Sequence, residues 1–273
     1  MTIEAFYINL DRSVERRERM EERISAHFDG LSCARFSAFE GDNRPSAISK
    51  AELGCFLSHR KVIENGAAAA FTCVLEDDVI FPAGFGRRLR ALLDQPGSVT
   101  PEWDILFLAQ MVDVANAPAL YRLLNLKQQL RPKGGAPQRF TFLDCRGVYV
   151  SGMSSYVVNP RSRALIVDLL QEAEARGFPE PVDIFLMRQI NCNALRARFL
   201  FPYLTGVDCQ QDSAVQEGEK LARSVLLEDL LNLLSVTADK ANLMARYQPT
   251  RKLVADETEK FLASQILFRR LIL

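Results

Sequence analysis

Three carboxylates stand next to one another in this sequence, at Glu76, Asp77 and Asp78, between the apolar runs FTCVL and VIF. Adjacent carboxylates at the end of a buried strand destabilise a fold unless a cation neutralises them, and carboxylate oxygens suit Mg²⁺ and Mn²⁺. In an extended chain Glu76 and Asp78 point to one side and Asp77 points away. The spacing alone favours a solvated turn that starts a helix. The apolar runs on both sides favour a metal site at Glu76 and Asp78, because they leave little solvated loop for three charges. A metal ion there would neutralise the charge on a leaving diphosphate.

A polar segment near the start of the chain could also bind a ligand. Asn9, Asp11 and Arg12 follow an apolar run, and a cluster of arginines begins at Arg16. Guanidinium and amide groups at this place could bind phosphate or a nucleoside. The arginine cluster is equally typical of a charged, solvated helix face, so we give more weight to Arg12 and Arg16 than to the arginines that follow.

Ser58 and His59 stand in the segment GCFLSHRKV, within a predicted amphipathic helix. His59 is a candidate ligand contact. By spacing alone, a histidine at such a position is more often a packed residue with hydrogen-bond partners than a binding residue. Both interpretations of His59 stay open at this point.

The elements that must position these residues alternate between strands and helices. Apolar runs predict buried strands at 3–10, 71–75 and 103–109, and helical patterns cover 12–27 and 49–66. This alternation predicts an α/β fold with a mainly parallel sheet covered by helices. Ligands of such folds bind at the carboxyl ends of the strands. Both polar segments, 9–12 and 76–78, follow strands at that end.

The rest of the chain divides at about residue 215. We expect a catalytic domain over 1–215 and a helical C-terminal extension over 216–273, with amphipathic helices at 219–234 and 258–271. Residues 111–142 contain scattered prolines and glycines and predict an irregular insertion. The later part of the first domain contains an interrupted strand, two helices and a short strand; they cover 148–159, 161–175, 182–191 and 199–203.

Composition excludes several classes of function. The 273 residues include 34 basic and 34 acidic side chains, so no global charge attracts nucleic acid. Six cysteines form no C-x-x-C pair and only two histidines occur, which argues against a structural zinc site. No run reaches the roughly 18 apolar residues of a membrane span. No signal peptide is evident, and we expect a cytoplasmic protein.

Three segments together resemble glycosyltransferase family 25, the lipooligosaccharide-biosynthesis type that also includes collagen galactosyltransferases. They are YINLDR at 7–12 with two arginines at 16–17, ELGCFLSH at 52–59 and LEDDV at 75–79. Each motif is weak alone, but their order and spacing within the first 80 residues fit the family. Weaker similarity extends to about residue 215, and the last part of the chain has no match that we can name.

The resemblance implies a GT-A-like fold that binds a nucleotide sugar together with Mn²⁺ or Mg²⁺. It implies transfer of a hexose, commonly galactose from UDP-galactose, to a cell-surface glycan or glycolipid, with inversion of the anomeric centre. Glu76 and Asp78 take the place of the metal-binding Asp-x-Asp element. The residues expected to contact the nucleotide sugar are Asn9, Asp11, Arg12, Arg16, Ser58, His59 and Glu76.

An inverting transferase needs a general base for the acceptor hydroxyl. We expect Asp183, which opens a predicted helix, to be this base, with Asp212 as the alternative. A carboxylate stabilised by the helix dipole is an equally good interpretation of Asp183. The long segment 111–142 and the sequence GMSS at 152–155 depart from the family pattern where sugar and acceptor specificity could be set.

Three other possibilities remain open. The chain could be a catalytically silent protein of the same fold that binds a nucleotide sugar or acts as a scaffold. It could be a metal-dependent phosphohydrolase or nucleotidyltransferase, although no second acidic cluster is evident. The basic and apolar tail, 260–273, could rest on the inner face of a membrane or pack on the domain or a second subunit. Liposome co-sedimentation against a chain ending near Asp256 distinguishes these last alternatives.

Overall fold

The structure is a computed structural model that describes most of the first 208 residues. The described residues are 1–94, 103–112, 122–123, 125–127, 129–130, 138–208 and 235–236. The expected helices at 219–234 and 258–271, the tail and Asp212 lie outside these residues. The division at residue 215 therefore stays a prediction.

A seven-stranded sheet forms the centre of the described part, in the order β2-β1-β3-β7-β5-β8-β6. Its strands are β1 (Ile3–Asn9), β2 (Cys33–Ser37), β3 (Phe71–Glu76), β5 (Ile105–Val112), β6 (Thr141–Asp144), β7 (Tyr149–Val158) and β8 (Ala197–Phe201). The strand β1 pairs in parallel with β2 and β3, and β5 pairs in parallel with β8. Both β7 and β6 are antiparallel to their neighbours. Five strands thus share one direction, which confirms the expected α/β class with a mainly parallel sheet.

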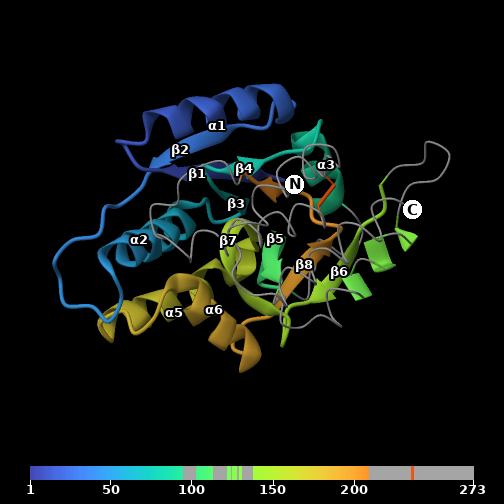
Figure 1. Cartoon of the computed structure of the whole chain (residues 1–273). Helices are drawn as coiled ribbons and strands as arrows, with labels where there is room; N and C mark the ends of the chain where they lie inside the picture. Colours follow the sequence, from blue (N-terminus) through green and yellow to red (C-terminus); the bar gives the residue numbers. More distant parts are fainter. Residues whose placement is uncertain are drawn as a thin grey trace, which may run out of the picture.

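Helices cover both faces of this sheet (Figure 1). They are α1 (Val14–His27), α2 (Lys50–Asn65), α3 (Phe85–Leu93), α5 (Arg163–Ala175) and α6 (Val182–Asn191). One apolar core lies between the sheet and α2, α5 and α6, and a second lies between the sheet and α1 and α3. None of the helices that the structure describes is long and apolar enough to cross a membrane.

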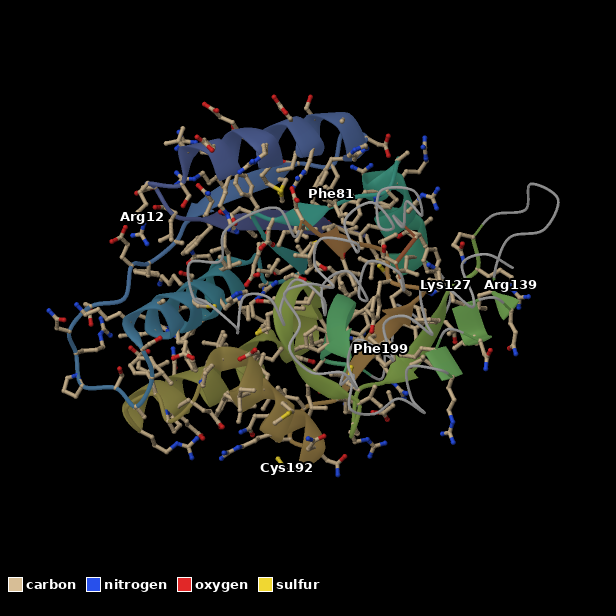
Figure 2. All side chains as sticks on the ribbon, viewed as in Figure 1. Arg12, Phe81, Lys127, Arg139, Cys192 and Phe199 are labelled. Atoms are coloured by element: carbon tan, nitrogen blue, oxygen red, sulfur yellow. The ribbon has the colours of Figure 1, made fainter. Side chains whose placement is uncertain are left out.

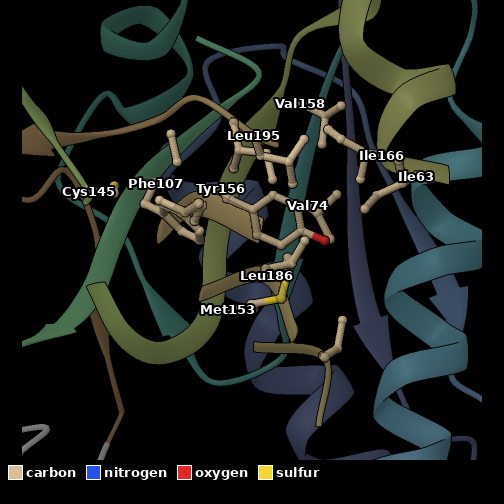
Figure 3. Close-up of a cluster of buried hydrophobic side chains, with 14 of the residues drawn as sticks. Ile63, Val74, Phe107, Cys145, Met153, Tyr156, Val158, Ile166, Leu186 and Leu195 are labelled. Atoms are coloured by element: carbon tan, nitrogen blue, oxygen red, sulfur yellow. The ribbon is translucent and has the colours of Figure 1, made fainter. Parts of the chain in front are cut away.

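The strand β7 shows how the pleat divides its side chains between the two cores. Tyr156 and Val158 pack in the core between the sheet and α2, α5 and α6, whereas Val157 packs in the core on the opposite face of the sheet. Successive side chains of a strand point to opposite faces, so one strand supplies both layers. Figure 3 shows the Tyr156 ring within its cluster, next to Val74 and Phe107.

Several elements differ from the sequence prediction. The strand β6 lies partly inside the segment expected to be irregular, and a two-stranded sheet joins β4 (Val79–Ile80) to β9 (Gly206–Val207). The strand β7 continues through Gly152, which takes a φ of 86° that glycine tolerates. Short antiparallel strands such as β6 and β9 obtain their pairing from distant partners, and local sequence does not encode it.

Candidate active site

The carboxyl ends of β1 and β3 bring the two polar segments together. The strands pair in parallel with Ile8 opposite Glu76, so Asn9 and Asp77 continue from adjacent strands at the same edge. The Asn9 side-chain amide donates a hydrogen bond to Asp77 Oδ2 at 2.6 Å. Parallel register thus joins residues 68 positions apart in the sequence.

Asp77 is neutralised by residues of the chain itself. Its side chain is 9% exposed, and Arg16 of α1 donates from Nε to Asp77 Oδ1 at 2.8 Å and forms an ion pair with it. The same guanidinium lies 3.2 Å from Asp78 Oδ2. Asp77 therefore acts as a buried anchor between α1 and the strand ends. Residues 77 and 78 form a turn and are not extended, so Asp78 shares the Arg16 guanidinium with Asp77, contrary to the expected side shared with Glu76.

Glu76 points toward α2, where His59 meets it. His59 Nε2 lies 3.3 Å from Glu76 Oε1, and His59 Nδ1 lies 2.9 Å from the Tyr156 hydroxyl. Because an ionised carboxylate only accepts hydrogen bonds, His59 Nε2 carries the proton that it donates to Glu76. Burial opposes ionisation of Glu76, but the hydrogen bond and charge of His59 outweigh it and lower the pKa of Glu76.

One face of α2 near this edge packs against the chain that follows β2. Gly54 and Ser58, one turn apart, lie against the segment 39–41 that follows β2: Phe39 N donates to Ser58 Oγ at 2.8 Å. A Cβ at Gly54 would lie 2.4 Å from the Phe39 carbonyl oxygen. Ser58 Oγ also donates to the Gly54 carbonyl at 2.6 Å, so its hydroxyl already has two backbone partners.

Cys55 and His59, also one turn apart, face Glu76. One ligand atom from each of Cys55, His59 and Glu76 lies within 4.8 Å of the other two. Burial raises the pKa of the Cys55 thiol well above its ordinary range, and the charges of Glu76 and Asp183 raise it further. The Cys55 side chain is partly buried, and its thiol stays protonated at the edge of the site.

Asp183 stands in the first turn of α6, at the same end of the sheet. Its Oδ2 accepts from Gly152 N of β7 at 3.2 Å, and its Oδ1 accepts from Ile184 N at 2.9 Å. Strand β7 and helix α6 therefore fix the carboxylate of the expected base, whereas Asp212 lies outside the described residues.

Asp11 and Arg12 lie further out. The Asp11 carboxylate is exposed and accepts from Arg35 and from Ser37 Oγ, and the Arg35 hydrogen bond lowers the pKa of Asp11. Arg12 forms an exposed ion pair with Glu40 at the rim of the molecule (Figure 2). Their place as nucleotide contacts stays a prediction.

Three residues at this site, Cys55, Tyr156 and Asp208, were not predicted from the sequence. Cys55 could have been found, because it stands four positions before His59 and helical spacing puts both on one face. Tyr156 gave no signal within its apolar run. Asp208 follows β9, and its amide donates to the Asp78 carbonyl at 2.8 Å while its carboxylate pairs with Arg23. That contact depends on pairing between β4 and β9, which the sequence did not reveal.

Glu76 and Asp78 fit a hard divalent ion in the chemistry of their donors. Both supply carboxylate oxygens, the type that Mg²⁺ and Mn²⁺ prefer. Their side chains are 34% and 20% exposed, more than the 9% of Asp77, and each also has a partner in the chain, His59 for Glu76 and Arg16 for Asp78.

Comparison with known proteins agrees with the three segments at this edge. The family described as "Glycosyltransferase family 25 (LPS biosynthesis protein)" matches residues 2–186. Procollagen galactosyltransferase 1 of Danio rerio is 28% identical over 130 residues, covering 39% of this chain and 21% of that protein. "Inactive glycosyltransferase 25 family member 3" of Homo sapiens is 31% identical over 128 residues, covering 39% of this chain and 22% of that protein. The matched region thus spans about a fifth of each of these relatives.

One solved structure with a similar course of the chain is the crystal structure of the galactosyltransferase LgtC in complex with donor and acceptor sugar analogues. It has a TM-score of 0.36 and 9% sequence identity, and the match covers 72% of this chain and 73% of that chain.

Proposed function

Because the chain belongs to glycosyltransferase family 25, we propose that it transfers a hexose from a nucleotide sugar to a glycan or glycolipid acceptor. The relatives named procollagen galactosyltransferases support galactose as the hexose, and we propose UDP-galactose as the donor. We propose inversion at the anomeric carbon, with an acceptor on the cell surface. The observation that carries the proposal is the convergence of Asn9, His59 and the acidic turn at the carboxyl ends of β1 and β3.

The division of partners within the acidic turn supports a donor site. Asp77 is the most buried of the three and contacts Asn9 and Arg16, and we propose Glu76 and Asp78, which also contact His59 and Arg16, as the carboxylates that would hold Mn²⁺ or Mg²⁺. A bound divalent ion would neutralise charge on the leaving diphosphate. His59 and Tyr156 orient the Glu76 carboxylate, and Arg16 positions Asp78 while adding positive charge beside the turn.

Asp183 is the residue that we propose as general base. Two backbone amides, of Gly152 and Ile184, fix its carboxylate at the amino end of α6. A carboxylate fixed in this way can accept the proton of an acceptor hydroxyl as the bond to the sugar forms. Asp212 remains the alternative base.

Two variants test these roles by separating binding from transfer. With UDP and Mn²⁺, the melting temperature of the chain should rise, because a ligand that binds the folded state stabilises it. We expect Asp78→Ala to lose this rise and to lose release of UDP from UDP-galactose. Asp168→Ala, which removes an exposed carboxylate of α5, is the matched control and should keep both. If no nucleotide sugar raises the melting temperature in the presence of metal, the donor site is refuted.

Asp183→Asn should keep the rise in melting temperature and lose transfer by about 100-fold or more, the usual contribution of a general base. The amide keeps an oxygen acceptor for the backbone but no longer accepts a proton. Unchanged turnover in this variant would move the role to Asp212 or to another residue.

A second candidate is a catalytically silent protein that binds a nucleotide sugar. It is favoured by the relative named "Inactive glycosyltransferase 25 family member 3", which is 31% identical over 128 residues. Such a protein would show the rise in melting temperature with UDP and metal but no release of UDP that Asp78→Ala abolishes. The same pair of measurements therefore separates the two candidates.

A further inference from the structure

The side of Glu76 that faces α2 presents a different set of donors from the side that faces Asp78. Cys55 and His59 are four positions apart in α2, which places a thiol and an imidazole on one face one turn apart. Glu76 at the end of β3 completes the group, with all three ligand atoms within 4.8 Å of one another. Among the residues that the structure describes, this is the group of three whose geometry fits a metal ion.

We propose that Cys55, His59 and Glu76 form a binding site for a thiophilic divalent cation of the Zn²⁺ class, separate from the oxygen-donor pair of Glu76 with Asp78. Sulfur, nitrogen and carboxylate oxygen are the donors that Zn²⁺ takes in proteins, and three protein ligands with a fourth open position are typical of a non-structural zinc site. With three protein ligands, this group differs from a structural zinc site, which is closed by four.

The distances allow an ion to enter with small side-chain rotations. Bonds of about 2.3 Å to sulfur and about 2.0 Å to nitrogen place tetrahedral ligands about 3.5 Å apart. His59 Nε2 is already 3.3 Å from Glu76 Oε1. The fourth position can open to solvent because the Glu76 side chain is 34% exposed, although His59 is 1% exposed.

Tyr156 supplies the outer partner that a metal-binding histidine needs. Its hydroxyl lies 2.9 Å from His59 Nδ1, which leaves Nε2 to face the ion. With an ion bound, the His59 proton moves to Nδ1 and is donated to the Tyr156 oxygen. Outer partners of this kind fix the ring and the tautomer.

The charges and protons balance on binding. The Cys55 thiol loses its proton to solvent, so each ion bound releases one proton. The thiolate and the Glu76 carboxylate then neutralise the two positive charges of the ion, while His59 stays neutral. The result is a neutral group in place of a carboxylate anion beside a thiol.

Occupation of this site would inhibit transfer, a consequence that rests on the proposed function. A bound ion would hold Glu76 in the direction it already takes, toward His59 on α2, and would leave Asp78 without its partner at the diphosphate side. We therefore expect Zn²⁺ to inhibit, and Mn²⁺ to relieve the inhibition only by competing for Glu76.

The test uses Co²⁺ as a spectroscopic probe of the reduced full chain, because a thiolate bound to Co²⁺ gives a charge-transfer band. We expect the band at one equivalent of Co²⁺, its loss on adding Zn²⁺, and no loss with Mg²⁺. Cys55→Ser should abolish the band. Cys192→Ser, which removes an exposed thiol at the far end of α6, should keep it (Figure 2).

Two further variants keep the test decisive if Cys55→Ser folds poorly. Tyr156→Phe should keep the band and weaken Zn²⁺ binding about 10–100-fold, the usual effect of losing an outer partner. Glu76→Gln should weaken it at least as much. No band in the native chain, a band that survives Cys55→Ser, or unchanged Zn²⁺ affinity in Glu76→Gln would overturn the site. These readouts need no nucleotide sugar, so they stand apart from the test of transfer.

Discussion

Replacing Arg16 by methionine tests whether Asp77 is the buried anchor of the acidic turn. Methionine keeps much of the length of the side chain but removes the guanidinium that contacts Asp77 and Asp78. Asp77 would keep the hydrogen bond from Asn9 at 2.6 Å and lose both bonds to its other oxygen. We therefore expect Arg16→Met to destabilise the chain.

The magnitude follows from the burial of the pair. Removing one partner from a buried ion pair costs about 3–5 kcal/mol, whereas an exposed pair contributes about 0–1 kcal/mol. Arg16 and Asp77 side chains are 21% and 9% exposed, which places the pair nearer the buried limit. Since Asn9 still satisfies one oxygen, we expect a loss of about 2–3 kcal/mol.

Urea denaturation of Arg16→Met, Asp77→Asn and the double variant measures the coupling. We expect a coupling free energy of about 1–3 kcal/mol, the range for residues in direct contact. Arg12→Met is the matched control, because Arg12 and Glu40 are 59% and 61% exposed and their pair should contribute less than about 1 kcal/mol. A coupling below about 0.5 kcal/mol, or equal losses in Arg16→Met and Arg12→Met, would refute the assignment of Asp77 as the anchor.

Two predictions concern the stability of the fold at Asp104, which precedes β5, and at Gly54 of α2. Burial alone would raise the pKa of Asp104, but hydrogen bonds from Arg196 and Ser162 outweigh burial and lower that pKa. The stability that ionised Asp104 contributes is therefore present above its unfolded pKa of about 3.9, and it is lost as pH falls through the folded pKa. The difference in urea midpoint between the native chain and Asp104→Asn should shrink from pH 7 to pH 3, and a constant difference would contradict it. Gly54→Ala should lower the melting temperature and destabilise the fold by about 1–3 kcal/mol despite the helix propensity of alanine. The reason is that the new Cβ would lie 2.4 Å from the Phe39 carbonyl oxygen. An unchanged or higher melting temperature would contradict this prediction and show that the segment 39–41 can move away.

The strands that carry the site were predictable because their signals are local. The run at Ile3–Asn9 and the run at Phe71–Glu76 are apolar and followed directly by polar residues, so their type and their carboxyl ends could be placed from the sequence. Parallel strands then bring those ends to one edge, as the pairing of Ile8 with Glu76 shows. The capping box of Ser49 and Glu52 likewise fixed the start of α2.

Other parts of the site were not predictable because they depend on pairing between distant segments. Tyr156 reaches His59 only because β7 runs antiparallel between β3 and β5. Asp208 reaches Asp78 only because β9 pairs with β4. These contacts depend on strands that are distant in the sequence, and neither the periodicity nor the residue types of a segment indicate which distant strand it pairs with.

The motif at Leu53–His59 shows why a recognisable pattern can hide two roles. Gly54 and Ser58 hold the segment 39–41 against α2, whereas Cys55 and His59 face Glu76. Each member of the second pair follows a member of the first pair directly in the sequence, so adjacent residues lie on different faces of the helix. One face contacts the segment 39–41 and the other contacts Glu76. Because Gly54 lets the backbone of 39–41 lie close, α2 sits where His59 can reach Glu76 at 3.3 Å. The packing contact of Gly54 thus sets the position of His59 relative to Glu76.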